Sequence, residues 1–421
     1  MNSRRAWLVF AAGTFAYLVA VTQRTSMGVA TVEAADRFGA SATGLAFFGM
    51  LQLGVYAGCQ LPVGLLMDRF GARRLIVAGI ATTALGQAVV AFAPVLAVAV
   101  AGRVLVGAGD AALFVSVLRL LPAWFTGRWL RILPQWLATT GQAGQLLSAI
   151  PFVSLLGIAG WTNAFLLLAA FSVLATVVAA LAIHDRPAGS VPPARGAGGS
   201  FAALRAAARE PGTWLGYFTH SATHPSVTVF TLMWGYPMLV LGLGLDAPAA
   251  AGVLTVAMVA SIALGPLVIA PLAARFPARL SDLVLIVMAV ILAAWLMILL
   301  WPDHPPVAVL VIFCIAIGAG GPSSVIAFEF ARQTSPLARL GSANAIVNMG
   351  GFVMCVVLIF IMGVILDAVP RLAPSADRWV SFQWASAAQL PLLAGAALAV
   401  LLLRRRVRAR RRAGAYSGFG E

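Results

Sequence analysis

The chain has 421 residues, of which 61% are hydrophobic and only 10% are charged. A mean hydropathy of +0.96 and repeated apolar runs of spanning length exclude an ordinary soluble domain and predict a polytopic helical membrane protein. The formal net charge of +15 would suggest a nucleic-acid partner in a soluble chain. Here every basic residue is an arginine, and nearly all of them lie at the ends of apolar runs, so no nucleic-acid partner is expected.

Twelve segments are long enough to span a bilayer. In the first half they are Ala6–Ala30, Ala42–Met67, Leu75–Ala93, Val95–Leu118, Leu133–Leu156 and Trp161–Ile183. In the second half they are Trp214–Leu239, Ala249–Ala273, Leu283–Leu300, Val307–Phe330, Ala343–Leu366 and Trp379–Leu403. The expected domains are a six-helix bundle over 1–184, a cytoplasmic linker with a short surface helix over 185–211, a second six-helix bundle over 212–403 and a basic tail over 404–421.

The arginines predict the orientation of the chain in the membrane. With both termini in the cytoplasm, 23 of the 28 arginines fall on the inner side and three on the outer side. We therefore expect an integral protein of the cell (plasma or inner) membrane with both termini cytoplasmic. The tail cluster Arg404–Arg412 is interpreted as an anchor against anionic lipid, with a specific partner as the alternative.

The remaining two arginines, Arg24 and Arg103, lie inside predicted spans. Arg103 is followed seven residues later by Asp110, which places both on one helix face, about 10 Å apart along the axis. A charge in hydrocarbon costs at least about 2.5–3.5 kcal/mol, so each needs a partner, water or a ligand. This polar stripe is a candidate site.

The two halves share short motifs, which indicates an internal repeat. Arg69-Phe-Gly-Ala-Arg73 recurs as Arg275-Phe-Pro-Ala-Arg279, and the Gly-Ala-Gly that begins at Gly107 recurs from Gly318. The offsets of 206 and 211 residues match a six-span unit used twice in the same orientation. Parallel six-span repeats around a midplane site are typical of transporters.

The stretch from Gly64 to Arg74 (Gly-Leu-Leu-Met-Asp-Arg-Phe-Gly-Ala-Arg-Arg) resembles the loop signature of the major facilitator superfamily between spans two and three. Arg103 with its following glycines resembles the span-four motif of that superfamily, and Gly160-Trp161 resembles the start of its sixth span. The resemblance implies an all-α fold of twelve transmembrane helices in two pseudo-symmetric six-helix bundles. It also implies transport by alternating access, without a cofactor.

The loop signature also implies a gate. Asp68 would accept hydrogen bonds from the N–H groups at the start of a helix, where an anion is favoured. By resemblance this helix is span eleven, which begins near Ser342–Asn344. Topology alone is the alternative; it explains the arginines but neither Asp68 nor the glycines. The predicted gating residues are Gly64, Asp68, Arg69, Gly71 and Arg73.

A narrower resemblance links the end of span one, Arg24-Thr-Ser-Met-Gly-Val-Ala30, to the anion:cation symporters. It implies that Arg24 and Arg103 bind the carboxylate of a substrate and that Asp110 couples transport to protons. The chain departs from that family in having Asp where Glu is usual, and in having His220 and His224 in span seven where some relatives have arginine.

The residues support the same hypothesis without the resemblance. Arg24 and Arg103 are expected at similar depth, where two guanidinium groups suit a carboxylate or phosphate. Protonation of the deeper Asp110 would change the charge of the three groups from +1 to +2, so proton and anion would bind cooperatively. The alternative is a structural ion pair between Arg24 and Asp110, and both arrangements could occur in different states.

Span seven carries His220 and His224 on one helix face, with Tyr217 one turn earlier. Hydrogen bonding to substrate is expected, with packing or a metal pair as alternatives; no acidic or cysteine ligand accompanies them, so no metal site is expected. Asn348 in span eleven would line the cavity or cap helix contacts. The predicted substrate-binding residues are Arg24, Arg103, His220, His224, Tyr217 and Asn348.

These observations predict a monomeric secondary active transporter of a small organic anion, carboxylate or sugar-acid-like, coupled to protons by symport. Proton-driven efflux in the same fold is an alternative, although the glycine-proline signature of antiporters is poorly met around Pro151. A facilitator without ion coupling and a non-transporting membrane receptor are further alternatives. An enzyme is not expected, because the sequence offers neither a Ser/His/Asp set nor a metal arrangement at a membrane face.

Overall fold

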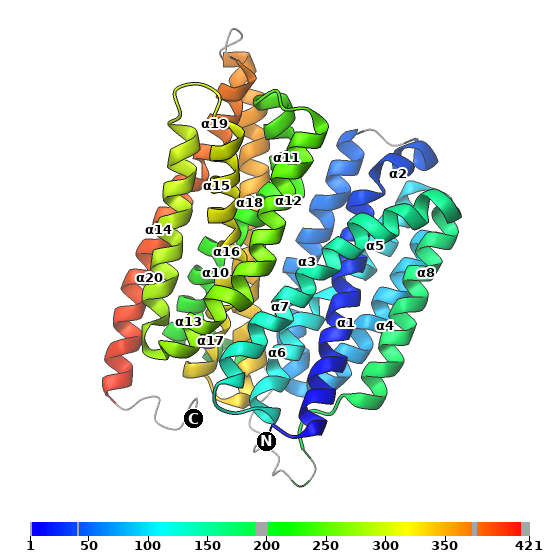
Figure 1. Ribbon diagram of the computed structural model, residues 1–421. Coiled ribbons are helices and arrows are strands. Elements are labelled where there is room, and N and C mark those ends of the chain that lie inside the picture. Colours follow the sequence, from blue (N-terminus) through cyan, green and yellow to red (C-terminus); the bar gives the residue numbers. More distant parts are fainter. Residues whose placement is uncertain (1, 40–41, 188, 190–200, 373–376, 414–421) are drawn as a thin grey trace. The chain divides into compact units, whose positions relative to one another are not determined.

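The computed structural model describes residues 2–39, 42–187, 189, 201–372 and 377–413, and within these ranges the regular structure is entirely helical (Figure 1). The chain divides into two compact units. The first comprises Met1–Glu210 and Ser335–Met349, and the second comprises Pro211–Thr334 and Gly350–Phe419, apart from the residues outside the described ranges. Helix α18 (Leu340–Leu372) begins in the first unit and ends in the second.

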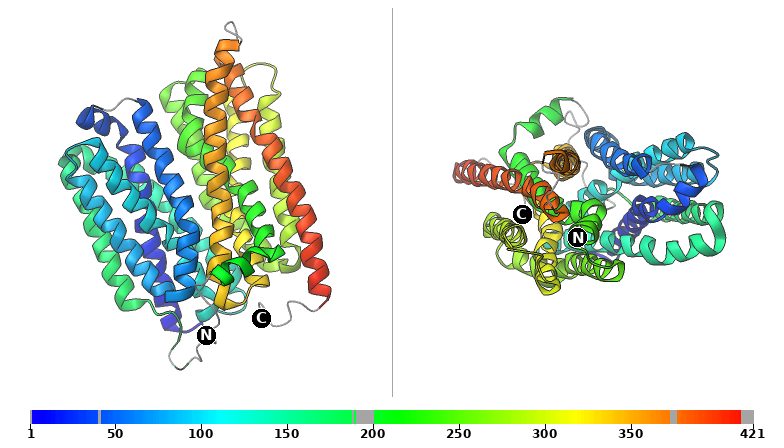
Figure 2. Two further views of the ribbon diagram at one scale, coloured as in Figure 1. Left: turned by 180° about the vertical axis from the view of Figure 1, so that it is seen from behind. Right: turned by 90° about the horizontal axis from the view of Figure 1, so that it is seen from above.

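Among its described residues, the first unit contains nine helices before α18, together with one wide π-helical turn, η1. They are α1 (Arg4–Val29), α2 (Thr31–Phe38), α3 (Ala42–Phe70), α4 (Ala72–Ala91), α5 (Leu96–Ala111), α6 (Leu113–Trp124), α7 (Trp129–Leu147), η1 (Ser148–Phe152), α8 (Val153–Ala182) and α9 (Phe201–Ala208). The short 3₁₀ turn η6 (Leu337–Arg339) precedes α18. Helices α1, α4 and α8 pack side by side (Figure 2). Helix α9 lies where the linker helix was expected, whereas α2 was not predicted.

The second unit contains a longer series of shorter segments, because several of its helices are interrupted. They are α10 (Pro211–Val229), η2 (Phe230–Trp234), α11 (Gly235–Pro237), η3 (Met238–Gly242), α12 (Ala247–Leu264), η4 (Gly265–Ile269), α13 (Ala270–Arg275), η5 (Pro277–Arg279), α14 (Leu280–Leu299), α15 (Val307–Gly318), α16 (Gly320–Ser324), α17 (Ile326–Thr334), α19 (Arg378–Ala387) and α20 (Gln389–Arg412). Its core is built from apolar side chains such as Trp295, Phe313 and Phe230, which meet edge to face.

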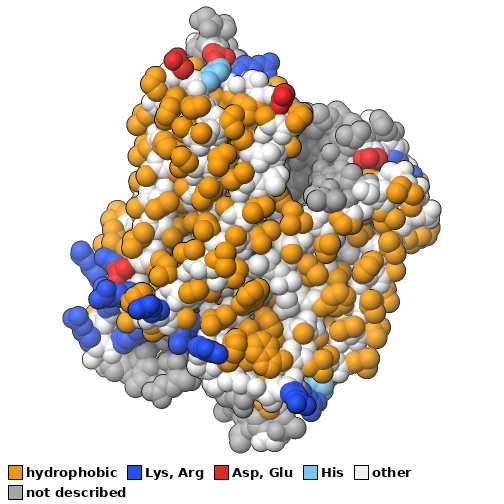
Figure 3. Space-filling model, in the orientation of Figure 1, with side chains coloured by type: hydrophobic (Ala, Val, Ile, Leu, Met, Phe, Trp, Pro, Cys, Tyr) orange, Lys and Arg blue, Asp and Glu red, His pale blue; other side chains and the backbone are white. Residues whose placement is uncertain are grey.

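Ten helical stretches among the described residues are long and apolar enough to cross a membrane. Helix α3 and the continuous α7–η1 segment occupy the positions of the second and fifth predicted spans. Large apolar side chains on the helix flanks remain exposed, for example Ile158 at 87% and Leu181 at 76%. Figure 3 shows apolar side chains over the helix flanks and basic side chains at the lower end of α20. Such surfaces suit lipid rather than water.

Proline and glycine explain where the long helices are interrupted. Pro151 lies within the wide turn η1, and Pro266 lies within the wide turn η4. Proline cannot donate a backbone hydrogen bond, and the local ladder widens to accommodate it. Gly160 separates the predicted fifth and sixth spans with φ +73° and ψ 172°, a conformation that glycine adopts readily.

Glycine also sets the distance between α4 and α5. A Cβ atom added to Gly86 would lie 2.6 Å from the carbonyl oxygen of Gly102, and one added to Gly79 would lie 2.6 Å from that of Gly109. The two helices therefore run antiparallel with backbone against backbone. Gly102 and Gly109 are seven residues apart, so both lie on the α5 face that packs on α4.

The arginine-bearing ends of the first unit gather at one end of its bundle. Arg5 lies 3.4 Å from the His184 ring, and Trp124 donates to the His184 carbonyl at 2.8 Å. Asp185, next in the chain, accepts from the Arg73 backbone N–H at 2.9 Å. The N-terminus, the loop after α3, the end of α6 and the end of α8 therefore share one end, as the predicted topology requires of this half.

Candidate site around an intramembrane ion pair

Helix α5 presents its two charges on a face that adjoins its glycine face. Arg103 directly follows Gly102 and Asp110 directly follows Gly109, so the seven-residue repeat turns both charges away from α4 together. Both side chains are buried, with relative exposures of 1% for Arg103 and 0% for Asp110. Close packing on one face and charge on the next thus arise from a single repeat.

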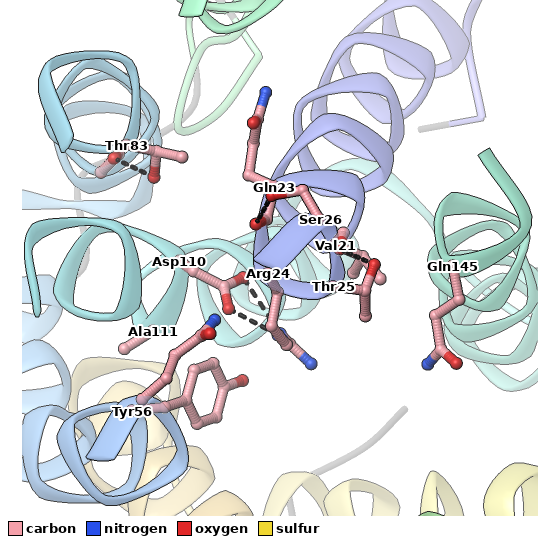
Figure 4. A network of polar contacts seen from close by, with 12 residues as sticks. Val21, Gln23, Arg24, Thr25, Ser26, Tyr56, Thr83, Asp110, Ala111 and Gln145 are labelled. Atoms are coloured by element: carbon pink, nitrogen blue, oxygen red, sulfur yellow. Dashed lines mark hydrogen bonds and ion pairs between the residues drawn. The ribbon is translucent and has the colours of Figure 1, made fainter. Parts of the chain in front are cut away.

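Asp110 forms an ion pair with Arg24 of α1 (Figure 4). The Arg24 Nε donates to Oδ2 at 2.6 Å and Nη2 donates to Oδ1 at 3.0 Å, which is a bidentate geometry. The Arg24 side chain is 14% exposed. Planar two-point pairing of this kind is the strongest form of carboxylate recognition by arginine. The ion pair that the sequence left as an alternative is therefore the arrangement in this structure.

Arg103 lies beside Arg24 but donates to two backbone carbonyls and one side-chain oxygen. Its Nη1 donates to the Gln23 carbonyl at 3.0 Å, and its Nη2 donates to the Arg24 carbonyl at 2.7 Å and to Gln52 Oε1. The expectation of similar depth is met, since Arg103 touches the Arg24 backbone. The two guanidinium groups do not share one ligand here. Arg103 holds α1 and α3 against α5 and leaves its positive charge next to the ion pair.

A cluster of buried amides adjoins Arg103 and was not predicted from the sequence. Gln87 of α4 donates to Gln23 Oε1 at 2.6 Å, and Gln23 donates to the Leu168 carbonyl and Ser172 Oγ of α8 at 2.8 and 2.9 Å. Gln23, Gln87 and Gln52 are each at most 8% exposed. A glutamine within an otherwise apolar span was the available signal, because a buried amide needs partners.

Tyr56 of α3 connects the ion pair to Asn348 of α18. The guanidinium carbon of Arg24 lies 4.7 Å from the centre of the Tyr56 ring, a cation–π distance. Asn348 Nδ2 donates to the Tyr56 hydroxyl at 3.1 Å. Tyr56 and Asn348 are both buried, at 2% and 1% exposure. Asn348 was predicted as a substrate ligand and Tyr56 was not predicted; an aromatic residue in an apolar span carries no signal of its own.

Asp68 of the predicted gating motif binds the start of α18 within the first unit. Asp68 Oδ1 accepts from the Gly341 N–H at 2.9 Å, and Oδ2 accepts from the Ser342 N–H at 2.9 Å and from its hydroxyl at 2.5 Å. These donors belong to the first turn of α18, where the helix dipole favours an anion. The partner helix is the one expected. The gating role itself stays a prediction.

The other motif residues shape the turn between α3 and α4. Gly71 has φ +85°, and a Cβ atom there would lie 2.6 Å from a carboxylate oxygen of Asp185. Arg73 donates through Nη2 to the Ala180 carbonyl at 2.7 Å. Arg69 lies over the Phe70 ring at 5.1 Å. A Cβ atom on Gly64 would lie 2.6 Å from that of Ala345, so glycine lets α3 and α18 approach closely.

The family model described as the Major Facilitator Superfamily matches residues 13–359. The chain belongs to the major facilitator superfamily. It is accordingly an integral membrane protein of a transporter family and not an enzyme, with the all-α fold that the sequence predicted. The membrane of residence and the cytoplasmic location of the termini stay predictions.

Individual relatives of this superfamily member give narrower information. Monocarboxylate transporter 11 of Mus musculus is 35% identical over 178 residues, which is 42% of this chain and 39% of the relative. The Homo sapiens protein of the same name is also 35% identical over 178 residues, covering 37% of its length. The chain thus aligns with less than half the length of these curated relatives.

Solved structures show the fold. The superfamily transporter FucP, in the outward conformation, has a TM-score of 0.74 and 15% identity over 95% of this chain and 99% of that chain. A variant of the Escherichia coli fucose:proton symporter FucP has a TM-score of 0.68 at 15% identity over the same shares. The narrower resemblance to the anion:cation symporters stays a prediction.

In the second unit of this superfamily member, His220 and His224 of α10 stack on each other. Their ring centres are 4.9 Å apart with 18° between the planes. His220 is 3% exposed, and within the described residues its Nδ1 has no hydrogen-bond partner. His224 Nε2 lies 3.2 Å from the Thr228 hydroxyl. Tyr217 packs on Trp214 and Phe218 instead of pairing with the histidines.

Within the described residues no group of three or more His, Cys, Asp or Glu side chains is placed to hold a metal ion. Cys314 and Cys355 are buried as free cysteines and Cys59 is partly buried. Their positions agree with a packing role.

Proposed function

We propose that this protein is a proton-coupled symporter of a small organic anion, and that the Arg24–Asp110 pair is its coupling centre. The observation that carries the proposal is the buried bidentate contact between these two side chains. A small-molecule substrate follows from membership of the superfamily. The relatives named monocarboxylate transporters support an anion as that substrate.

The proposed coupling follows from the charges. With Asp110 ionised, its carboxylate occupies the two-point donor face of Arg24. With Asp110 protonated, Arg24 loses its counter-charge inside the membrane, and a buried charge without a partner costs about 3–5 kcal/mol. An organic carboxylate can replace Asp110 on the same donors. Proton and anion therefore favour each other's binding, which is the linkage that symport requires.

Arg103 has a supporting role in the proposal. Its three oxygen partners keep its guanidinium in place, so its charge remains beside Arg24 in both states. That positive charge disfavours an Arg24 guanidinium without a counter-ion and favours the binding of an anion to it. The substrate contacts predicted for Tyr217, His220, His224 and Asn348 stay predictions.

Uptake into proteoliposomes tests the proposal. A panel of labelled monocarboxylates, sugar acids and organic phosphates is offered with and without an inward proton gradient. We expect at least one carboxylate to accumulate only with the gradient. The charged groups that act on the Asp110 carboxyl are Arg24 and Arg103, and the titratable side chains in its surroundings are those of Tyr17 and Tyr56.

Two variants separate the roles. Asp110→Asn should abolish gradient-driven accumulation and flatten the dependence of flux on pH, while substrate exchange at equal concentrations continues. Arg24→Ala should abolish both processes. Continued accumulation by Asp110→Asn, or full flux in Arg24→Ala, would contradict the proposed coupling centre.

A further inference from the structure

Helix α18 is attached to α3 at two polar points within the first unit. Asp68 receives the first-turn N–H groups of Gly341 and Ser342, and Tyr56 receives the Asn348 side chain. Between these points a Cβ atom on Gly64 would come within 3.1 Å of the Ser342 Cα. Helix backbone therefore lies close to helix backbone along this contact. Because the two helices are packed this closely, a movement at either polar contact cannot be taken up by rearrangement of apolar side chains between them.

The Tyr56 side chain serves two partners at once. Its ring face lies under the Arg24 guanidinium at 4.7 Å, and its hydroxyl accepts from Asn348 at 3.1 Å. Figure 4 shows the Arg24 side chain between Asp110 and the Tyr56 ring. Asp110 sets the position of Arg24, Arg24 lies on Tyr56, and Tyr56 holds Asn348. Four helices, α5, α1, α3 and α18, are joined in this series.

We propose that Tyr56 is a positioning residue that transmits the charge state of Asp110 to the start of α18 through Asn348. A guanidinium that turns from Asp110 to an anion leaves the ring face, and the tyrosine then loses the contact that fixes its ring. The Asn348 hydrogen bond weakens, and the first turns of α18 are held by Asp68 alone. This inference rests on the proposed function, because it assigns a readout to the same ion pair.

Burial favours this role over direct substrate contact for the same residues. Asn348 is 1% exposed, and one N–H of its side-chain amide donates to Tyr56. A side chain this deeply buried offers little surface to a ligand. The neighbouring buried polar residue on α3, Gln60, donates instead to backbone carbonyls of α3 and α5. Tyr56 therefore carries the polar connection from this part of α3 to α18.

Hydrogen exchange without substrate tests the inference. The amide exchange rates of residues 340–349 are measured at one pH for the full-length protein in detergent. The unmodified protein is compared with Asp110→Asn, which represents the neutral form of the acid. Asp110→Asn should speed exchange of this segment by about three- to tenfold, the factor that one hydrogen bond commands. Tyr56→Phe keeps the ring and removes the hydroxyl, and it should speed exchange by a similar factor.

The decisive comparison is the combined variant. In the Tyr56→Phe or Asn348→Ala background, Asp110→Asn should add nothing further, because the connection is already cut. A tyrosine that only packs would give independent effects that multiply, and that result would overturn the inference. Tyr236→Phe, at a residue of the second unit that is 44% exposed, is the matched control and should leave the effect of Asp110→Asn unchanged.

Failure of the proposed function and failure of the role of Tyr56 give different results. If the protein accumulates no anion with a proton gradient, yet the effects of the combined substitutions on exchange fail to multiply, the connection through Tyr56 stands and the coupling proposal falls. If uptake is gradient-driven and the effects multiply, the coupling proposal stands and the role of Tyr56 falls. If Asn348→Ala fails to fold, Asn348→Ser replaces it, because serine has a shorter donor side chain and leaves Tyr56 intact.

Discussion

Both oxygens of the Asp68 carboxylate are engaged by α18, and Ser342 supplies two of the three donors, its backbone N–H at 2.9 Å and its hydroxyl at 2.5 Å. The arrangement is that of a helix N-terminus binding an anion, with the acid provided by a residue more than 270 positions earlier in the chain. The contact depends on a carboxylate, because every partner is a donor.

Asp68→Asn should reduce transport strongly while the protein still folds. The amide can accept at one oxygen, but its NH₂ group would face the backbone N–H of Gly341 or of Ser342 at the other position, and neither N–H can accept. Loss of a hydrogen bond to a charged group costs about 1.5–3 kcal/mol. Uptake into proteoliposomes gives the transport effect, and thermal unfolding checks the fold. Ser342→Ala, which keeps both backbone donors, is the milder companion, and normal uptake by Asp68→Asn would refute the gating role.

The antiparallel glycine contact between α4 and α5 gives a second prediction. Gly86→Ala should destabilise the protein by about 1–3 kcal/mol, since the added methyl meets the backbone at Gly102 instead of a movable side chain. Gly157→Ala in α8 is the matched control, because nothing lies within 4 Å of its added Cβ atom. Thermal unfolding of the two variants in the same detergent measures the difference. Equal unfolding temperatures would contradict the backbone contact.

Much of the fold follows from the sequence alone. Apolar length placed the spans, Gly160 marked a boundary, and the resemblance of the loop signature to the superfamily indicated the helix that Asp68 contacts. The cause is physical: hydrocarbon forbids unsatisfied backbone, so span positions depend on local composition. The α2 helix was missed because it is too short and too polar to give a spanning signal.

The site was less accessible to sequence reasoning than the fold. Arg24, Arg103 and Asp110 stood out as charges within spans, yet their pairing depends on how α1 rotates against α5. Seven residues of spacing gave the shared face of Arg103 and Asp110 but said nothing of Arg24. Tyr56 entered only through three-dimensional contacts, because an aromatic residue in a span has no polar cost that demands a function. The glutamines gave a signal, since a buried amide needs partners, but the sequence did not identify those partners.

A lysine substitution distinguishes two roles for Arg103, which are to hold α1 in place and to bind substrate directly. Arg103→Lys keeps the charge but offers one compact group to three separated oxygens. We expect lower thermal stability, because each lost hydrogen bond from a charged donor costs about 1.5–3 kcal/mol. Gln52→Leu removes one of the same partners and should reproduce part of the loss. Unchanged stability with a raised KM for substrate would instead assign Arg103 to the substrate.

The histidine pair in the second unit depends on a glycine. An added methyl group at Gly351 would overlap the imidazole ring of His220, which also lies against Phe328 at 5.5 Å between ring centres. Gly351→Ala should therefore displace His220 from its stack with His224 and lower stability by about 1–3 kcal/mol. Gly395→Ala in α20, with nothing within 4 Å of the added Cβ atom, is the control and should unfold like the unmodified protein.

A compensating variant shows what the pair does. His220→Ala relieves the overlap, so the double variant with Gly351→Ala should regain part of the stability that Gly351→Ala loses, because the imidazole no longer occupies the space of the new methyl group. Uptake kinetics then separate the two uses proposed for the histidines. Recovered stability with normal KM identifies packing residues, whereas recovered stability with a KM that stays raised identifies a contribution of His220 to substrate binding.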